Sequence, residues 1–190
     1  MLKFLLLFFM GFLTINIALA QKDEAIKQMP VLNGDLIYTD SIAVQGHTMA
    51  QLDTAAKKWF YSYFKYTDTN VARTAKDKKS IIFNRGVFEF KCTPMFVTFP
   101  YYGIVTMQVQ CKNNYYTYKI YQIWFRPENG VLNSLAYKSS ADYLLKLYNK
   151  KHLSFSELMS IDKAEVKNYL FSIDESIRLC ILSLNKAMVN

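Results

Sequence analysis

The chain has few of the residues from which catalytic and metal sites are usually built. Its 190 residues include three cysteines and two histidines. It lacks the C-x-x-C and H-E-x-x-H patterns of redox and zinc sites, the G-x-S-x-G turn of hydrolases, and the glycine-rich loops that hold nucleotide phosphates. His47 and His152 lie in separate segments, each without a ligand-spaced partner. We therefore predict no cofactor and no metal, and no motif identifies a catalytic residue.

Cysteine is absent from the first 91 residues, which excludes a lipid-carrying cysteine close to the N-terminus. An exported protein could form a disulfide between Cys92 and Cys111, although an odd number of cysteines leaves one thiol over. The alternative is that the cysteines are small buried apolar residues. Cys111 on an apolar strand face and Cys180 on an apolar helix stripe suit this second interpretation. Cys92 lies at a strand end and is expected to be more exposed.

The first twenty residues have the pattern of a cleavable secretory signal peptide. Lys3 supplies a positive charge, residues 4–13 are almost entirely apolar, and Ala18 and Ala20 provide the small residues that signal peptidase requires. The apolar run is about half the length of roughly 20 residues that a spanning helix needs, so we prefer a signal peptide to an uncleaved anchor. We predict cleavage between Ala20 and Gln21. The mature protein would be periplasmic, envelope-associated or secreted, with no transmembrane segment.

The mature chain, residues 21–190, is long enough for one domain that buries roughly 70% of the surface of its unfolded form. The net charge of the whole chain is +8, but the basic residues occur as short dispersed pairs such as Lys57-Lys58 and Lys150-Lys151. Such pairs are typical of solvated faces. The alternative is a basic patch for anionic envelope lipids or polysaccharides.

Hydrophobic periodicity predicts a strand over 35–44 and a helix over 49–65. Thr48 and Gln51 have the spacing of a capping box at the start of that helix. Further strands are predicted over 81–92, 105–111 and 115–125, with a bulge at Gly86 where the alternation changes parity. In the last third, Ser140 and Asp162 are predicted to cap helices, and the second of these carries an apolar stripe suited to packing on a sheet. A coiled coil is the less favoured interpretation of that stripe.

Strands that cluster between helices predict an α+β fold in which helices pack on one face of an antiparallel β-sheet. The stretch Met29-Pro30-Val31-Leu32-Asn33-Gly34-Asp35-Leu36-Ile37-Tyr38, with Val44 and the helical run Ala56-Lys57-Lys58-Trp59-Phe60, resembles the opening of a bacterial, typically exported family of unknown function. That resemblance implies a TATA-binding-protein-like (TBP-like) fold. It implies no catalytic residues and no DNA binding, because function belongs to sites and not to folds.

Combined with the periodicity, the resemblance predicts four segments. They are a signal peptide over 1–20, a lead-in over 21–33, a TBP-like core over 34–126, and a helical C-terminal segment over 127–190 that packs on the core.

The strand over 115–125 is aromatic on both faces. Simple alternation places Tyr116, Tyr118, Ile120 and Trp124 on one face and Tyr115, Tyr121, Ile123 and Phe125 on the other. We predict that a ligand or partner binds the second face. The candidate residues are Tyr115, Tyr121 and Phe125 on that face, with Tyr101 and Tyr102 near its rim. The alternative is that a helix covers this face.

The leading hypothesis is therefore an exported cell-envelope protein of unknown function that acts as a non-catalytic binding domain. Its partner would be an envelope protein or a small apolar or sugar ligand, and not nucleic acid, because an exported protein does not meet chromosomal DNA. One alternative is an envelope enzyme whose site is assembled in three dimensions, with Cys92, His47 or His152 beside an acid in a concave pocket. Another is a lipid-surface protein steered by its positive charge. The sequence leaves the oligomeric state open.

Overall fold

The computed structural model describes residues 22–64, 72–74, 81–93, 98–127, 139–152, 154 and 162–190. The predicted signal peptide and its cleavage site lie outside these residues. Residues 22–27 are helical. The elements that follow are β1 (Val31–Leu32), β2 (Asp35–Leu36), β3 (Tyr38–Ala43), α2 (Met49–Tyr63), β4 (Ala72–Thr74), β5 (Ile81–Cys92), β6 (Phe99–Lys112), β7 (Tyr115–Pro127), β8 (Ser139–Ser140), α3 (Ala141–Asn149) and α5 (Lys163–Val189).

Six strands form one antiparallel sheet in the order β3-β7-β6-β5-β4, and β8 pairs with β7 beyond the end of β3. The strands β1 and β2 form a separate small hairpin. The long strands β5, β6 and β7 make the centre of the sheet, and β3 forms one edge. This sequential, hairpin-connected centre is typical of an α+β fold.

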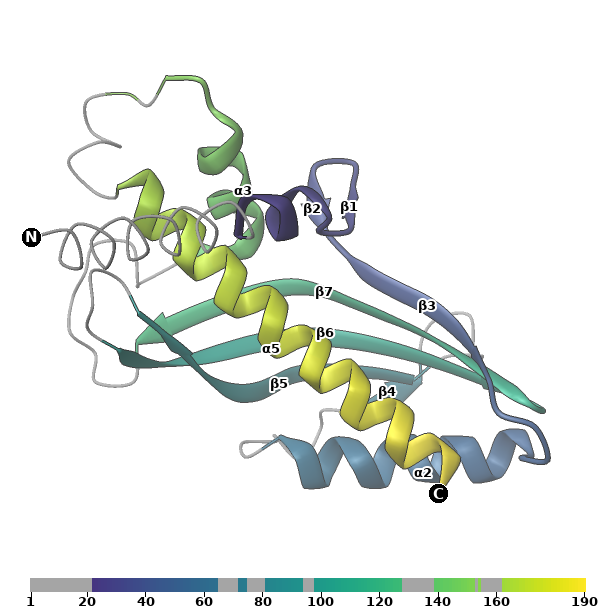
Figure 1. The fold of residues 1–190 in the computed structure, drawn as a ribbon. Helices are drawn as coiled ribbons and strands as arrows, with labels where there is room; N and C mark the ends of the chain where they lie inside the picture. The colour runs from purple at the N-terminus through teal and green to yellow at the C-terminus, as the bar shows by residue number, and fades with distance from the viewer. Residues whose placement is uncertain are drawn as a thin grey trace, which may run out of the picture.

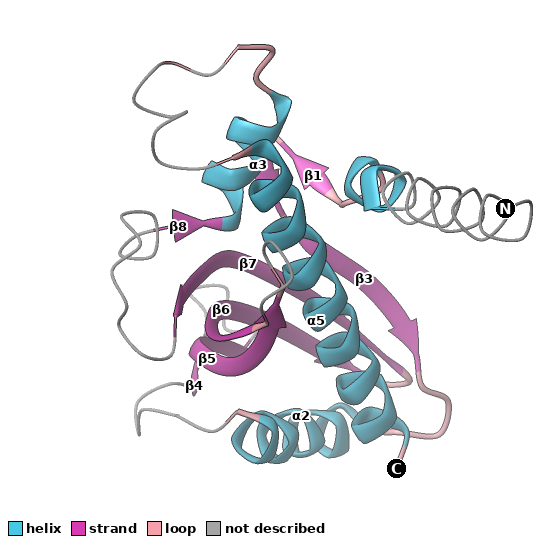
Figure 2. Ribbon diagram, turned by 60° about the vertical axis from the view of Figure 1, so that its left-hand side comes forward, coloured by secondary structure: helices cyan, strands magenta, loops and turns pink. Residues whose placement is uncertain are grey.

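The helices α2 and α5 cover one face of the sheet. Figures 1 and 2 show α5 running diagonally across that face, with α2 below it and α3 at the upper end of α5. The Phe60 ring of α2 stacks on Phe83 of β5, and Tyr169 of α5 stacks on Phe125 of β7. The buried side chains of these elements form one hydrophobic core. The predicted α+β architecture with helices on one sheet face is confirmed.

Two of the three predicted helix caps make side-chain hydrogen bonds. The Thr48 side chain accepts a hydrogen bond from the backbone of Gln51, and the Gln51 side chain accepts one in return from the Thr48 backbone. The Ser140 side chain caps α3 through the backbone of Tyr143. Asp162 occupies the first position before α5 but makes no side-chain cap hydrogen bond, so its contribution is that of a negative charge near the helix start.

Two β-bulges shape the central strands. The register of β5 against β6 shifts between Phe83 and Gly86, which confirms the predicted bulge. A second shift lies in β7, where Tyr121 pairs with Thr106 but Trp124 pairs with Ile104. Gln122 is the extra residue and adopts a left-handed backbone with φ of 54°.

The bulge at Gln122 overturns the predicted faces of the second half of β7. Because one extra residue is inserted, the side chains that follow it move to the opposite face from the one that simple alternation assigns. Phe125 and Ile123 are therefore buried against the helices, and Trp124 points to the other face. Placing Phe125 on the same face as Tyr115 and Tyr121 was wrong.

Candidate functional site

The face of the sheet opposite α2 and α5 is the candidate binding site. Along β6, residues at odd positions from Tyr101 to Cys111 are buried, while those at even positions from Tyr102 to Gln110 stay partly accessible. The same alternation in β7 leaves Tyr115, Tyr121 and Trp124 partly or largely accessible. We call this surface the open face.

The open face is built from cross-strand pairs of β6 and β7. Its centre is apolar and aromatic, because Ile104 lies opposite Trp124 and Thr106 lies opposite Tyr121. The Thr106 hydroxyl also donates a 3.0 Å hydrogen bond to the side-chain oxygen of Gln122. Trp124 is 45% exposed, although burying a tryptophan is strongly favourable. Further along the strands, the open-face pairs are Gln108 with Lys119, Gln110 with Thr117 and Lys112 with Tyr115.

Each of the three tyrosines of the open face carries a basic side chain over its ring. The Lys112 ammonium lies 5.2 Å from the ring centre of Tyr115, and the Lys119 ammonium lies 5.2 Å from that of Tyr121. The Arg126 guanidinium lies 5.7 Å from the ring centre of Tyr102. These cation–π contacts hold positive charge around the aromatic centre and each contributes about 0.5–1 kcal/mol at an exposed position.

The structure separates the five residues predicted to bind a ligand. Tyr102, Tyr115 and Tyr121 lie on the open face, whereas Tyr101 and Phe125 are buried beneath α5. The Tyr101 and Tyr169 hydroxyls form a hydrogen bond of 2.5 Å, and burial raises the pKa of both side chains. Tyr101 and Phe125 are therefore part of the core and are not available to a ligand.

Trp124 is the most exposed aromatic residue of the open face, and the predicted site does not contain it. Simple alternation places Trp124 on the face of Tyr116 and Tyr118, which the helices cover, because it does not account for the bulge at Gln122. Bulges with a left-handed residue usually carry glycine at that position, and a glutamine gives no such indication. The continuous aromatic character of this strand also hid the change of parity.

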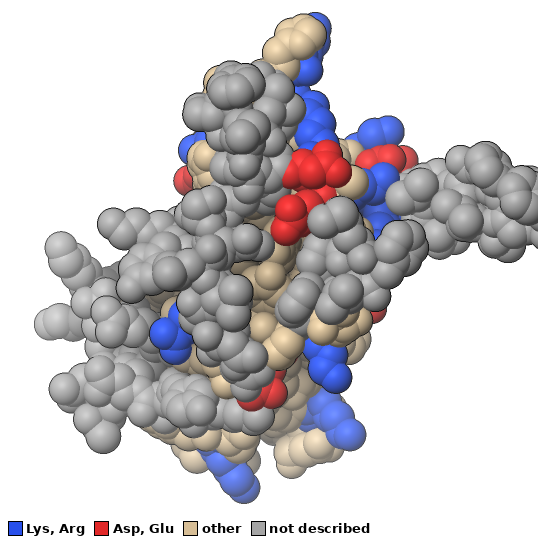
Figure 3. Space-filling model, turned by 90° about the vertical axis from the view of Figure 1, so that its left-hand side faces the viewer, with Lys and Arg blue, Asp and Glu red and all other residues tan. Residues whose placement is uncertain are grey.

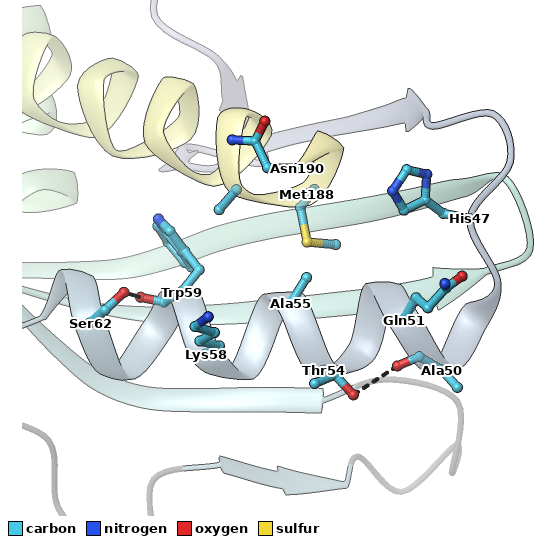
Figure 4. Close-up of a pocket in the computed structure, with 11 residues that line it drawn as sticks. His47, Ala50, Gln51, Thr54, Ala55, Lys58, Trp59, Ser62, Met188 and Asn190 are labelled. Atoms are coloured by element: carbon cyan, nitrogen blue, oxygen red, sulfur yellow. Dashed lines mark hydrogen bonds between the residues drawn. The ribbon is translucent and has the colours of Figure 1, made fainter.

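A groove of about 730 Å³ runs between α2 and the C-terminal end of α5. Figure 4 shows Trp59 and Ala55 of α2 and Met188 of α5 lining it, with His47 at one end. The Trp59 indole N–H donates a 3.1 Å hydrogen bond to the Ser183 hydroxyl and so ties the two helices together. The described residues that line this groove include His47 but no aspartate, glutamate or cysteine side chain.

The three cysteines are free and buried. Cys92 is fully buried, so the expectation that it is more exposed was wrong. Burial raises the pKa of the Cys92 thiol to about 11 and that of the Cys111 and Cys180 thiols to about 12. Thiols held in this way are protonated near neutral pH and are poor nucleophiles.

The charged groups do not gather into one patch on the side of the molecule seen in Figure 3, where lysine and arginine side chains stand at several separate places. Within the described ranges, no three His, Cys, Asp or Glu side chains lie close enough together to hold a metal ion. Among the same residues, no helix has the length and apolar character needed to cross a membrane.

No protein-family model and no curated protein matches the sequence. The structure is similar to that of a TBP-like protein from Parabacteroides distasonis, with a TM-score of 0.60, 13% identity, and coverage of 85% of this chain and 97% of that one. It is also similar to a DUF4468 family protein from Bacteroides ovatus, with a TM-score of 0.59, 13% identity, and coverage of 85% and 91%. The chain therefore has a TBP-like fold, as its resemblance to the family of unknown function implied.

Proposed function

We propose that this protein is an exported, non-catalytic binding domain whose ligand or partner occupies the open face of β6 and β7. The observation that carries the proposal is the exposure of Trp124 at the centre of that face, beside Ile104 and Tyr121. Tryptophan and tyrosine dominate binding energy at interfaces because they bury a large area with little loss of side-chain freedom.

The arrangement of the open face supports a ligand with an apolar or ring-shaped surface. Aromatic side chains on a regular sheet are rigid, so a ligand that stacks on them loses little additional entropy in ordering the protein. The basic side chains at Tyr102, Tyr115 and Tyr121 place positive charge around this centre. An envelope protein or a small apolar or sugar ligand fits such a surface. Because the protein is predicted to be exported, nucleic acid is not the proposed ligand.

The test measures retention of envelope proteins and carbohydrates on the immobilised protein. Trp124→Ala is compared with Tyr143→Ala, because Tyr143 is an exposed aromatic residue of similar accessibility on α3. We expect a component that binds the unmodified chain and the Tyr143→Ala variant, and that binds the Trp124→Ala variant at least about tenfold more weakly, the effect of losing a central aromatic residue. Equal binding by both variants would refute the proposed site.

A further inference from the structure

The outer surface of α5 carries an apolar seam that stays exposed to solvent in the described part of the chain. Leu179 and Leu182 are 58% and 62% exposed, and Leu182 is the most exposed large hydrophobic residue among those described. Five exposed residues follow one another along this surface at alternating steps of four and three: Glu175, Leu179, Leu182, Lys186 and Val189. This spacing keeps side chains on one line along a helix, as in a coiled-coil seam.

The sheet-facing stripe of α5 is separate from this outer seam. As predicted for that stripe, its residues are buried in the core: Val166, Leu170, Ile173, Ile177 and Leu184. Positions half a turn away from them form the outer seam. Two opposite sides of the helix therefore carry apolar residues. One side packs on the sheet, and the other is the outer seam.

Residues 22 and 23 contact the outer surface of α5 near its start. The Lys22 ammonium donates a 2.8 Å hydrogen bond to the Asn168 side chain and lies 5.4 Å from the ring centre of Phe171. Asp23 forms a 2.6 Å ion pair with Lys167. Asn168 and Phe171 precede Glu175 on the same line of the helix by seven and four residues. The seam from Glu175 onward thus begins where the cover from residues 22 and 23 ends.

We propose that two copies of this chain associate through the outer seam, with their α5 helices antiparallel around a two-fold axis between Leu179 and Leu182. A two-fold interface brings the same patch of both copies together, so the patch must complement itself. In this register, Leu179 lies opposite Leu182 of the second copy. Because Glu175 precedes Leu179 by four residues and Lys186 follows Leu182 by four, Glu175 lies opposite Lys186 of the second copy.

The charges of the seam select the antiparallel arrangement. A parallel pair of helices in equal register would place Glu175 opposite Glu175 and Lys186 opposite Lys186, which is unfavourable. The antiparallel pair has an apolar centre with an acid–base pair at each end. Arg178 beside the seam is already neutralised, because its Nε donates a 2.7 Å hydrogen bond to the Asp174 carboxylate. It therefore brings no uncompensated positive charge to the interface.

The shape of the surface suits this contact. The part of the seam that is symmetric about the axis extends from Glu175 to Lys186 and is about 18 Å long at 1.5 Å per residue. A groove of about 450 Å³ adjoins Leu182 and is lined by Tyr38 and Thr39 of β3 and by Tyr118 of β7. Since α5 and the open face lie on opposite sides of the sheet, association through α5 leaves both open faces accessible. The inference is thus independent of the proposed function.

The first experiment is sedimentation velocity on the full chain over a wide range of concentration. We expect a species with the mass of two copies that dissociates on dilution. The Leu182→Glu variant should be monomeric at every concentration, because it places two carboxylates in the apolar centre of the dimer interface. The matched control is Met49→Glu, since Met49 is 55% exposed at the start of α2, where a negative charge is tolerated. Circular dichroism should show that both variants remain folded.

A charge reversal tests the register. Glu175→Lys and Lys186→Glu should each raise the dimer dissociation constant by about three- to tenfold, because each turns two exposed ion pairs into two like-charge pairs. The double variant should restore the original dissociation constant, because both ion pairs form again with their charges reversed. A single copy at every concentration would overturn the proposal. So would a dimer that survives Leu182→Glu, or a double variant that is no better than either single variant.

Discussion

The hydroxyl of Tyr38 in the edge strand β3 donates a 2.7 Å hydrogen bond to the Oδ1 atom of Asp174 in α5, 136 residues away in the chain. Arg178 donates a second 2.7 Å hydrogen bond to the other carboxylate oxygen. Asp174 is the buried charged residue of the described chain, with 5% exposure. A carboxylate in such a position is tolerated only when donors surround it. The hydrogen bond between Tyr38 and Asp174 therefore ties α5 to the edge strand β3.

Tyr38→Phe removes one of the two donors without changing the shape of the core. We expect the free energy of unfolding to fall by about 1–3 kcal/mol, because a buried charged acceptor loses a partner. Denaturant unfolding followed by circular dichroism measures the change. Tyr61→Phe is the matched control, since Tyr61 is an exposed tyrosine of α2 and its substitution should change stability by less than about 0.5 kcal/mol. An equal effect of the two substitutions would show that the hydrogen bond contributes nothing specific.

The same pair makes stability depend on alkaline pH. Burial, and then the charge of Asp174, raise the pKa of Tyr38 above its ordinary value. In the unfolded chain, tyrosine loses its proton near about pH 10. The folded state then holds more protons than the unfolded state, so the contribution is intact below about pH 10 and declines as the pH rises above it. Unfolding curves between neutral pH and about pH 11 should show this decline, and it should be shallower in Tyr38→Phe. An unchanged slope would contradict the assignment.

The thiols should be unreactive until the protein unfolds. Burial raises the pKa of all three, to about 11 for Cys92 and about 12 for Cys111 and Cys180. At pH 8 we expect a thiol-specific reagent such as DTNB to modify none of them quickly in the folded protein, and to modify all three after addition of guanidinium. Fast modification of one thiol in the folded protein would contradict the structure. A count of one after unfolding would instead indicate a disulfide in the purified protein.

Gly103 is required because the ring of Phe88 lies directly on its backbone. A methyl group at this position would overlap the ring, and the ring is itself held in the core. Gly103→Ala should lower the free energy of unfolding by about 1–3 kcal/mol through overpacking. Adding Phe88→Leu to Gly103→Ala should recover part of this loss, although Phe88→Leu alone is destabilising. Additive losses in the double variant would show that the two residues do not interact.

The sequence predicted the elements whose local chemistry is distinctive. Thr48 and Gln51 identified the start of α2, and Gly86 identified a bulge, because each has a residue type suited to a special backbone position. The position of Tyr115 and Tyr121 on one face also followed from alternation. Asp174 could not be recognised as buried, since its partner Tyr38 is distant in the chain and only the tertiary fold brings the two together.

Simple alternation assigns Trp124 and Phe125 to the wrong faces of β7, because it does not account for the left-handed backbone at Gln122. Alternation identifies faces when one side is polar, but β7 has aromatic residues on both sides, so a shift of one residue leaves the pattern unchanged to the eye. The bulge at Gln122 decides which aromatic residue faces the ligand and which packs under α5.

The left-handed backbone of Gln122 predicts an unusual ranking of substitutions at this position by their effect on stability. Its φ of 54° is costly for a β-branched residue, although β-branched residues are normally favoured in strands. We expect Gln122→Val to lower the free energy of unfolding by about 1–2 kcal/mol, and Gln122→Asn to leave it nearly unchanged, because asparagine tolerates the left-handed region. Gln110→Val on the neighbouring strand β6 is the control, since Gln110 also lies on the open face and pairs regularly with Thr117. Denaturant unfolding of the three variants measures the order. If valine were tolerated at position 122 as well as at 110, the bulge would not be the feature that turns Trp124 outward.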